Sequence, residues 1–320
     1  MLRNPISGRA RHSAALVLAL GLISSACGGG GVPEPGTGAA PASSSSDAFP
    51  VTVAAANGKV TIDARPERIV SLSATATEML FAIGAGDQVE AVDNQSDYPP
   101  DVPTTELSGY EPNVEAIAGY EPDLVVASSD AGLKSLAKVG IPLIVHPAVA
   151  DFDEAYAQFE QLGLATGHVS EAEAEVDRIR TEIEEITSTL PSLNEKPTYY
   201  HELDQTYFSV TSKTFIGRVY ELAGLENIAD KADKAGTGYP QLSAEYIIDA
   251  DPDFIFLADS ECCGQTPAKV SSRPGWSQIT AVRSGAVFDV GDDISSRWGP
   301  RIVDFLEIVV DAIKEVQPAA

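Results

Sequence analysis

One pattern of residues occurs twice in this chain, in "VEAIAGYEPDLVVAS" from Val114 and in "AEYIIDADPDFIFLAD" from Ala244. Each copy places a glutamate, Glu115 or Glu245, seven residues before a Pro-Asp pair that leads into an apolar run. A short helical pattern followed by such a run is typical of an α/β unit, and its repetition favours two similar lobes. The alternative is that any two α/β units resemble each other.

Short apolar runs alternate with helical patterns along the rest of the chain. The first half contains "RIVSL", "VEAVDN", "PDLVVAS" and "IPLIVHP", and the second half repeats the order with "TYYHEL", "PDFIFLAD" and "AVFDV". This alternation favours an α/β fold with mainly parallel sheets. Helices are expected between the runs, including one at "AGLKSLAKVG". The sequence therefore predicts two similar three-layer α/β lobes, at residues 51–165 and 193–320.

A long helical pattern joins the two predicted lobes at residues 166–192. Between Ser170 and Leu190, apolar residues recur at spacings of three and four, which places one apolar stripe along a helix with a charged opposite face. Ser170 is expected to cap the start of this helix and Pro191 to end it. About twenty residues give a rod of roughly 30 Å, long enough to connect two lobes rigidly. A coiled coil with a partner helix is the alternative.

The N-terminus has the features of an export signal. Residues 1–26 combine arginines with an apolar core that is too short to span a bilayer as a stable helix. The "SSAC" that follows resembles a bacterial lipoprotein cleavage site and makes Cys27 the lipidated residue, although Ser24 stands where leucine is usual. Residues 27–50 are rich in Gly, Pro, Ala and Ser and form a flexible tether. We expect an extracytoplasmic protein anchored to the membrane; an ordinary secreted protein is the alternative.

The charge and length of the chain restrict its function. The formal net charge of −26 excludes a surface that follows nucleic-acid phosphates and disfavours adhesion to anionic lipids, so contact with the membrane is expected through the anchor alone. About 270 residues remain after the tether, enough for two lobes with their own hydrophobic cores.

The order of several segments resembles a known family. They are "PERIVSLSATATEMLFAIGAGDQVEAVDNQSDYP", "NVEAI", the second copy "AEYII" and "SSRWGPRIVDFLE", and the resemblance extends from Pro66 to about Val316. The family is that of the helical-backbone substrate-binding proteins of ABC importers, which receive iron–siderophore complexes, haem or cobalamin. The resemblance implies a monomer without a cofactor that captures a metal chelate and delivers it to a permease dimer. Ala74 departs from the family, where proline is frequent.

The resemblance also gives the repeated glutamates a function. In this family one surface glutamate on each lobe docks into arginine pockets on the two permease subunits, and the matching positions are Glu115 and Glu245. A pseudo-twofold receptor on a twofold partner has to present the same charge twice, and carboxylate–arginine pairs are directional. The alternative is that each glutamate only favours the N-terminus of its own helix.

The ligand is expected between the lobes, where loops follow the carboxyl ends of the strands. Aromatic side chains suit a broad, rigid chelate because they bury a large area at low entropic cost, although each could equally pack in the core. In cobalamin-binding relatives the tyrosine of "SDYP" packs against the corrin ring, which favours Tyr98. The candidates are Tyr98, Thr77, Glu78, Tyr110, Tyr207, Phe208, Tyr239, Arg297 and Trp298. Trp276 is expected in the core.

Two classes of chelate stay open at this point. Tyr98 and Trp298 favour cobalamin or another corrinoid. Arg297, Arg301 and Lys213 could instead hold the charged periphery of an iron–siderophore complex.

Histidines are few in the predicted folded part of the chain. A bare zinc or manganese site needs several converging imidazole and carboxylate ligands, so no metal site is expected. His146 and His201 follow strands and could reach the cleft, which keeps haem ligation open. His168 is expected to be exposed.

Cys262 and Cys263 are adjacent in "DSECCGQT", after the run "FIFLA". Outside the cell thiols tend to oxidise, so the two are expected to form a disulfide that stiffens a loop at the rim of the cleft. Two reduced thiols or an intermolecular bridge are the alternatives.

Two other functions remain in consideration. One is a surface hydrolase that uses a serine with His201, although the chain has neither a G-x-S-x-G nor an H-E-x-x-H motif. The other is a haem-binding or scavenging lipoprotein that binds such a ligand without a permease.

Overall fold

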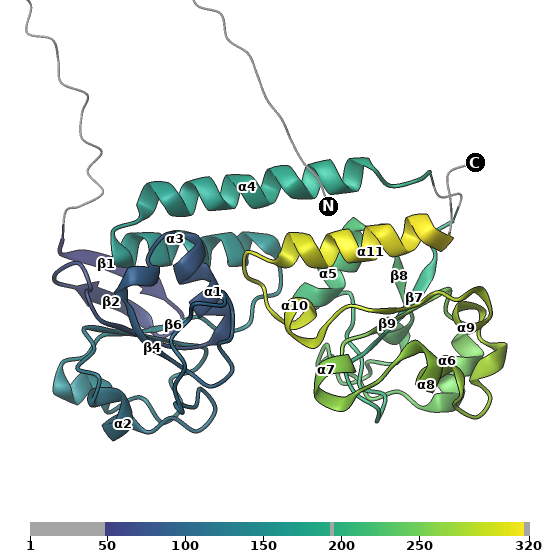
Figure 1. Ribbon diagram of the computed structural model, residues 1–320, viewed down its shortest axis with the longest axis horizontal. Coiled ribbons are helices and arrows are strands. Elements are labelled where there is room, and N and C mark those ends of the chain that lie inside the picture. Colours follow the sequence, from purple (N-terminus) through teal and green to yellow (C-terminus); the bar gives the residue numbers. More distant parts are fainter. Residues whose placement is uncertain (1–48, 193–194, 317–320) are drawn as a thin grey trace, which may run out of the picture. The chain divides into compact units, whose positions relative to one another are not determined.

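The computed structural model describes residues 49–192 and 195–316, which belong to one compact unit, Ser44–Ala320. The predicted signal peptide, Cys27 and nearly all of the tether lie outside the described residues. The fold is α/β with two lobes, each built around a four-stranded parallel sheet, as the sequence predicts (Figure 1). None of the helices in the described ranges has the length and apolar character needed to span a membrane.

The two sheets have the same topology. In each, the second strand lies outside the first, and the third and fourth follow on the other side, so the orders are β4-β3-β5-β6 and β8-β7-β9-β10. All pairs are parallel. The strands are β3 (Ile69–Leu72), β4 (Val89–Val92), β5 (Leu124–Ala127), β6 (Leu143–Val145), β7 (Thr198–Glu202), β8 (Glu226–Asn227), β9 (Phe254–Leu257) and β10 (Val287–Asp289).

An antiparallel hairpin of β1 (Val51–Ala55) and β2 (Gly58–Ile62) precedes the first sheet and was not expected. The sequence carries its signal, because Asn57-Gly58 is a dipeptide that favours tight hairpin turns, and Gly58 has a φ of 110°.

The helices connect the strands and cover the sheets (Figure 1). They are α1 (Ala74–Ala82), α2 (Val114–Ala118), α3 (Phe152–Thr166), α4 (Val169–Ser188), α5 (Phe215–Leu222), α6 (Ala244–Ala250), α7 (Ser260–Cys263), α8 (Pro267–Ser271), α9 (Thr280–Ser284), α10 (Asp292–Ser296) and α11 (Ile302–Val316). The helix expected at "AGLKSLAKVG" is only a 3₁₀ turn, Leu136–Val139, which Gly140 ends in the left-handed conformation.

The predicted connecting helix is α4, which runs along α3 and α11 (Figure 1). Its stripe is confirmed, since Ala172, Val176 and Ile179 are buried against these helices. The prediction that Ser170 caps the helix is wrong. His168 occupies the cap position without a capping side-chain bond, and the Ser170 hydroxyl donates to Glu171 instead.

The repeated Pro-Asp pair has one structural role in both lobes. The residue before each proline, Glu121 or Asp251, has a positive φ, of 50° or 44°, which ends the preceding helix. The aspartate after each proline then accepts backbone N–H bonds where the first strand of its sheet begins. Asp123 accepts from Glu67 and Arg68, and Asp253 accepts from Thr198. The pair therefore fastens the third strand of each sheet to the first.

Candidate ligand-binding site

A cavity of about 250 Å³ lies between the two lobes. The first lobe contributes residues that follow the carboxyl ends of its strands, and the second contributes α10 and the two residues after it. Ligands in open α/β sheets bind at this edge. The lining residues are Leu72, Ser73, Ala74, Thr75, Asp93, Gln95, Gly109, Tyr110, Ser128, Asp293, Ser296, Arg297 and Trp298.

Three of the predicted ligand-binding residues line this cavity. Tyr110 is 86% exposed and stands free at the wall of the first lobe. Trp298 is half-buried, and its indole N–H donates to Gln158 on α3 at 2.8 Å, which fixes the ring. Arg297 is the third. The structure thus brings together one aromatic residue from each lobe and one cation.

Thr77 was predicted to contact the ligand, and this is wrong. Its side chain is 0% exposed on the inner face of α1, and its hydroxyl lies 2.8 and 2.9 Å from the hydroxyls of Ser71 and Ser96. Ser96 also donates to the Asp93 carboxylate at 2.6 Å. Thr77 therefore belongs to a polar network that supports the cavity wall from behind.

Glu78, also predicted to contact the ligand, is 2% exposed and does not line this cavity. Its carboxylate lies between two guanidinium groups. Arg297 donates to Oε1 at 2.9 Å, and Arg301 donates to Oε2 at 3.0 Å and to Oε1 at 2.5 Å. Both carboxylate oxygens are thus occupied by cations from the other lobe.

Arg297 makes further bonds around the cavity. It donates to the Asp97 carboxylate at 2.9 Å and to the Gln95 carbonyl at 3.0 Å, and it pairs with Asp293 at 2.6 Å. Burial favours protonated Asp97, but the hydrogen bond and the positive charge of Arg297, with smaller contributions from Asp293 and the backbone, together lower the pKa of Asp97. Burial raises the pKa of Asp93 and of Asp293. At this cavity Arg297 is already neutralised by carboxylates.

Tyr98 does not line this cavity. Its ring packs under the guanidinium of Arg301, 4.2 Å from the ring centroid, at a second cavity of about 420 Å³. That cavity lies among α1, α4 and the start of α11, and Glu78 and Arg178 also line it. Glu78 therefore stands between the two cavities.

The other aromatic candidates of the second lobe, Tyr207, Phe208 and Tyr239, are also outside the cavity lining. Tyr207 is half-buried, stacks on Trp276 at a centroid distance of 5.9 Å and has a φ of 70°. Phe208 and Tyr239 are partly exposed on neighbouring loops. Trp276 is buried, which confirms its predicted place in the core.

The histidines are not placed as expected. His146 and His201 are buried, and burial lowers the pKa to about 4 and about 3, respectively. His146 contacts Gln161, and His201 contacts the Tyr220 hydroxyl at 2.8 Å. Because both side chains are buried, the structure argues against haem ligation by either histidine and against a hydrolase that uses His201. His168 is half-buried against Arg65 rather than exposed.

A buried charged cluster at the carboxyl edge of the second sheet was missed by the sequence analysis. Glu202, at the end of β7, forms a bidentate ion pair with Arg273, with both bonds at 2.6 Å. Asp259, which follows β9, is fully buried, and both of its oxygens lack a hydrogen-bond partner in the described structure. Burial, reinforced by Glu202, raises the pKa of Asp259 to about 7.

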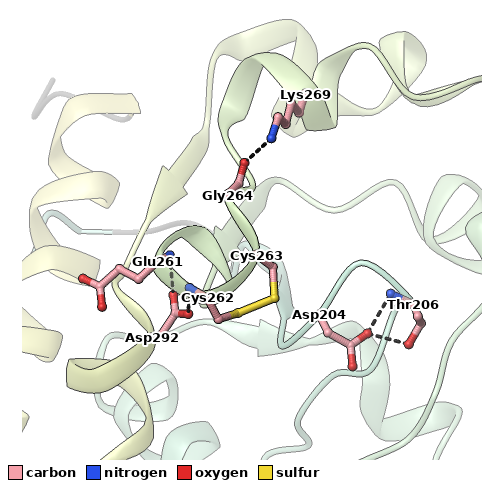
Figure 2. Close-up of a disulfide and its surroundings, with 8 residues drawn as sticks. All are labelled: Asp204, Thr206, Glu261, Cys262, Cys263, Gly264, Lys269 and Asp292. Carbon is pink, nitrogen blue, oxygen red and sulfur yellow. Dashed lines mark hydrogen bonds between the residues drawn. A yellow bond between two sulfur atoms is a disulfide. The ribbon is translucent and has the colours of Figure 1, made fainter.

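Cys262 and Cys263 are joined by a disulfide in the exposed turn α7, beside this cluster (Figure 2). The backbone N–H groups of Glu261 and Cys262 donate to the carboxylate of Asp292 at 3.0 and 2.7 Å. Asp292 is the first residue of α10, and Asp293 after it lines the interlobe cavity. The disulfide turn is therefore attached to the helix that forms one wall of the site.

A larger cavity, about 860 Å³, lies elsewhere, beside the hairpin and the amino ends of β5 and β6. Ligand sites of such sheets lie at the opposite edge, so the interlobe cavity is the better candidate. Within residues 49–192 and 195–316, no three His, Cys, Asp or Glu side chains gather so that they could hold a metal ion.

Comparison with known proteins defines the class. The model of the periplasmic binding protein family matches residues 69–294. YvrC of Bacillus subtilis, described as an uncharacterized ABC transporter substrate-binding lipoprotein, is 32% identical over 280 residues, which cover 83% of this chain and 86% of YvrC. The cobalamin-binding protein of Halobacterium salinarum is 30% identical over 309 residues, covering 92% of this chain and 82% of that protein.

A solved structure supports the same assignment. A possible iron-binding, periplasmic solute-binding protein from Staphylococcus epidermidis is 27% identical, with a TM-score of 0.69 over 78% of this chain and 99% of that one. The chain belongs to the periplasmic binding protein family, which confirms the family predicted from the sequence.

Proposed function

We propose that this protein is the solute-binding component of an ABC importer, which captures a metal chelate between its lobes and delivers it to a permease. The observation that supports this most is the interlobe cavity, to which Tyr110 from one lobe and Trp298 from the other contribute. At about 250 Å³ it is smaller than the roughly 300–1,000 Å³ of enclosed small-molecule sites. The chelate would therefore overlie the cavity.

The charge around the cavity bears on whether the chelate is anionic. Around the cavity, the guanidinium groups of Arg297 and Arg301 face the carboxyl groups of Glu78, Asp93, Asp97 and Asp293. The positive charge of each arginine is therefore balanced by carboxylates and is not available to an anionic ligand. Lys213, the third cation considered, is exposed on the second lobe near Asp233 and is not among the lining residues. We propose a neutral or cationic chelate, such as a corrinoid or a hydroxamate complex, over an anionic one.

Binding titrations with the soluble chain from residue 49 test the proposal. We expect cyanocobalamin or a ferric hydroxamate to raise the melting temperature as its concentration rises, because a ligand of the native state stabilises it. Ferric citrate, which is anionic, should bind at least about tenfold more weakly. If no metal chelate shifts the melting temperature, the proposed function is wrong. If ferric citrate binds best, only the charge preference is wrong.

Tyr98, Tyr207, Phe208 and Tyr239 enter the proposal only if the lobes move. In the described conformation they lie outside the lining of the interlobe cavity. Replacement of Tyr110 by alanine should therefore weaken chelate binding more than replacement of Tyr239. Both residues are exposed, so the melting temperature of the free protein should stay within about 2 °C in each case.

The repeated glutamates are proposed to dock the permease. Glu115 and Glu245 are exposed, and each is the second residue of the helix that precedes the third strand of its sheet. Asn113 and Ser243 already cap these helices, so the glutamates are not needed as caps. Reversal of either charge to arginine should reduce uptake by the importer and leave chelate affinity unchanged. Glu173→Arg, on the exposed face of α4, is the matched control and should affect neither.

The boundaries and the anchor are also proposals. We propose a signal peptide at residues 1–26, a tether at 27–50, lobes at 51–165 and 193–320, and the connecting helix within 166–192. Lipidation of Cys27 would hold the protein outside the cell, and Cys27→Ala should release it from the membrane fraction. Membrane retention of that variant would contradict the anchor.

The disulfide is proposed to exist in the native protein. Both cysteines are exposed, and an extracytoplasmic location favours oxidation. A thiol count on unreduced, unfolded protein from residue 49 should find no free thiol. Two titratable thiols would exclude the bond.

A further inference from the structure

The segment from Arg297 to Arg301, here called the clasp, leaves the second lobe after α10, and four of its five residues bond the first lobe or α4. Arg297 and Arg301 bind Glu78, and Trp298 donates to Gln158. The carbonyl of Pro300 accepts from Arg178 on α4 at 3.1 Å. Arg297 and Trp298, which line the cavity from the second lobe, are therefore held in place by side chains of the first lobe.

Gly299 lies beside the buried carboxylate of Glu78. A Cβ at this position would lie 3.4 Å from Glu78 Oε2 and 3.6 Å from Glu78 Cβ, which is ordinary van der Waals contact, so the close approach does not depend on a glycine.

Glu78 is the anionic centre of the clasp. It is 2% exposed, and among residues 49–192 and 195–316 it is the one side chain that bonds both arginines. A buried carboxylate between two guanidinium groups is strongly held, and its removal leaves cations without a partner in a poorly solvated place. Without Glu78, Arg301 would keep no carboxylate partner among the described ion pairs, whereas Arg297 would keep Asp97 and Asp293.

We infer that Glu78 is the positioning residue that fixes the clasp between the lobes and, by neutralising Arg297 from behind the cavity, makes the site discriminate against anionic chelates. This inference rests on the proposed function. Glu78 acts without touching the ligand, because its carboxylate is directed at the two guanidinium groups and it does not line the interlobe cavity.

Glu78→Gln tests this assignment. The glutamine keeps the shape, removes one negative charge and presents an N–H group to guanidinium donors, so the clasp loses a bond. We expect affinity for cyanocobalamin to fall about tenfold or more, because Arg297 and Trp298 lose their fixed orientation. The ratio of ferric citrate affinity to cyanocobalamin affinity should rise at least about tenfold, because the surroundings of the cavity become more positive by one charge and Arg301 is left without a carboxylate partner.

Two further variants control the experiment. Glu221→Gln removes the carboxylate of an exposed ion pair with Arg218 and should change neither affinity. Glu78→Asp keeps the charge but is too short to bond both arginines fully. It should lose part of the cyanocobalamin affinity and keep the wild-type preference against ferric citrate. Higher salt should reduce the gained ferric citrate affinity of Glu78→Gln, which a purely structural defect would not produce.

The outcomes separate the two ideas. If wild type binds a chelate and Glu78→Gln keeps the wild-type ratio of affinities, the inference is wrong and the proposed function stands. If wild type binds no metal chelate, the proposed function fails and the inference fails with it. If Glu78→Gln does not fold, Glu78→Asp tests the inference instead. Because Glu78→Asp keeps the negative charge, loss of the preference against ferric citrate in this variant would show that the charge of Glu78 does not set that preference.

Discussion

The two lobes have the same strand order but different chemistry at the carboxyl edges of their sheets. In the first lobe this edge carries a network of hydroxyls, Ser71, Thr77 and Ser96, that ends at Asp93. In the second lobe the equivalent edge buries Glu202 with Arg273 and leaves Asp259 beside them. The two lobes thus share the topology of their sheets, whereas the polar side chains at the carboxyl ends of the strands differ between them.

The cores differ in the same way. The interior of the first sheet is mainly aliphatic, as at Ile69, Leu124 and Ile144. The second lobe stacks aromatic rings, with Tyr199 on Tyr220 at 4.0 Å and Tyr220 near Phe256 at 5.0 Å. The same strand order therefore accommodates two kinds of core. The repeated sequence pattern determines how the strands are connected, and it does not determine which side chains contact each other in the core.

Arg273→Met should give the largest effect and test the charged edge of the second lobe. It leaves Glu202 buried without its bidentate partner, so the free energy of unfolding should fall by about 3–5 kcal/mol. Arg218→Met, which breaks an exposed ion pair in the same lobe, should cost at most about 1 kcal/mol. Urea unfolding measures both, and equal losses would show that the buried pair has no special role.

Asp123→Ala and Asp253→Ala test the equivalence of the lobes. Each removes a carboxylate that fastens the third strand to the start of the first, so each should cost about 1.5–3 kcal/mol. The two losses should be similar. If only one variant is destabilised, the Pro-Asp pairs do not have the same role.

Asp259→Asn should have a smaller effect that depends on pH. The pKa of Asp259 is about 7 in the folded protein against 3.8 for an ordinary aspartate, so the folded state binds the proton more tightly. Wild type should therefore lose stability as the pH rises from about 4 to about 7. The groups facing Asp259 are Glu202, Arg273 and Asp292.

The asparagine cannot ionise, so its stability should vary less over this range. At pH 8 the variant should be more stable than wild type by about 1–3 kcal/mol, measured by urea unfolding. At pH 4 the two should be nearly equal. A variant that is less stable than wild type at pH 8 would show that the charged form of Asp259 is favoured.

Most of the fold could be predicted from the sequence. The strands around "PDLVVAS" and "PDFIFLAD" and the helix at Val169–Ser188 follow from periodicities that act over a few residues. The hairpin at Asn57-Gly58 was missed although its signal was present. The cap at Ser170 was wrong because a serine near a helix start can bond a neighbouring side chain instead.

The site could be predicted only in part. Arg297, Trp298 and Tyr110 line the cavity, as expected for loops at the carboxyl ends of strands. Thr77 and Glu78 do not line the cavity, although they follow β3, the strand that leads directly into the cavity lining. Both lie on the inner face of α1. That a residue follows shortly after a strand in the sequence does not show which face of the next helix its side chain occupies.

By itself the sequence determined the repeated units, the long helix between them and the two exposed glutamates, because helical and strand periods, prolines and caps act locally. Only the tertiary structure decided which charges meet. Glu78 and Arg297 are 219 residues apart in the chain, yet the charge of the cavity depends on the 2.9 Å between their atoms. Electrostatic energy depends on distance and burial after folding, and neither quantity is written in the spacing of residues.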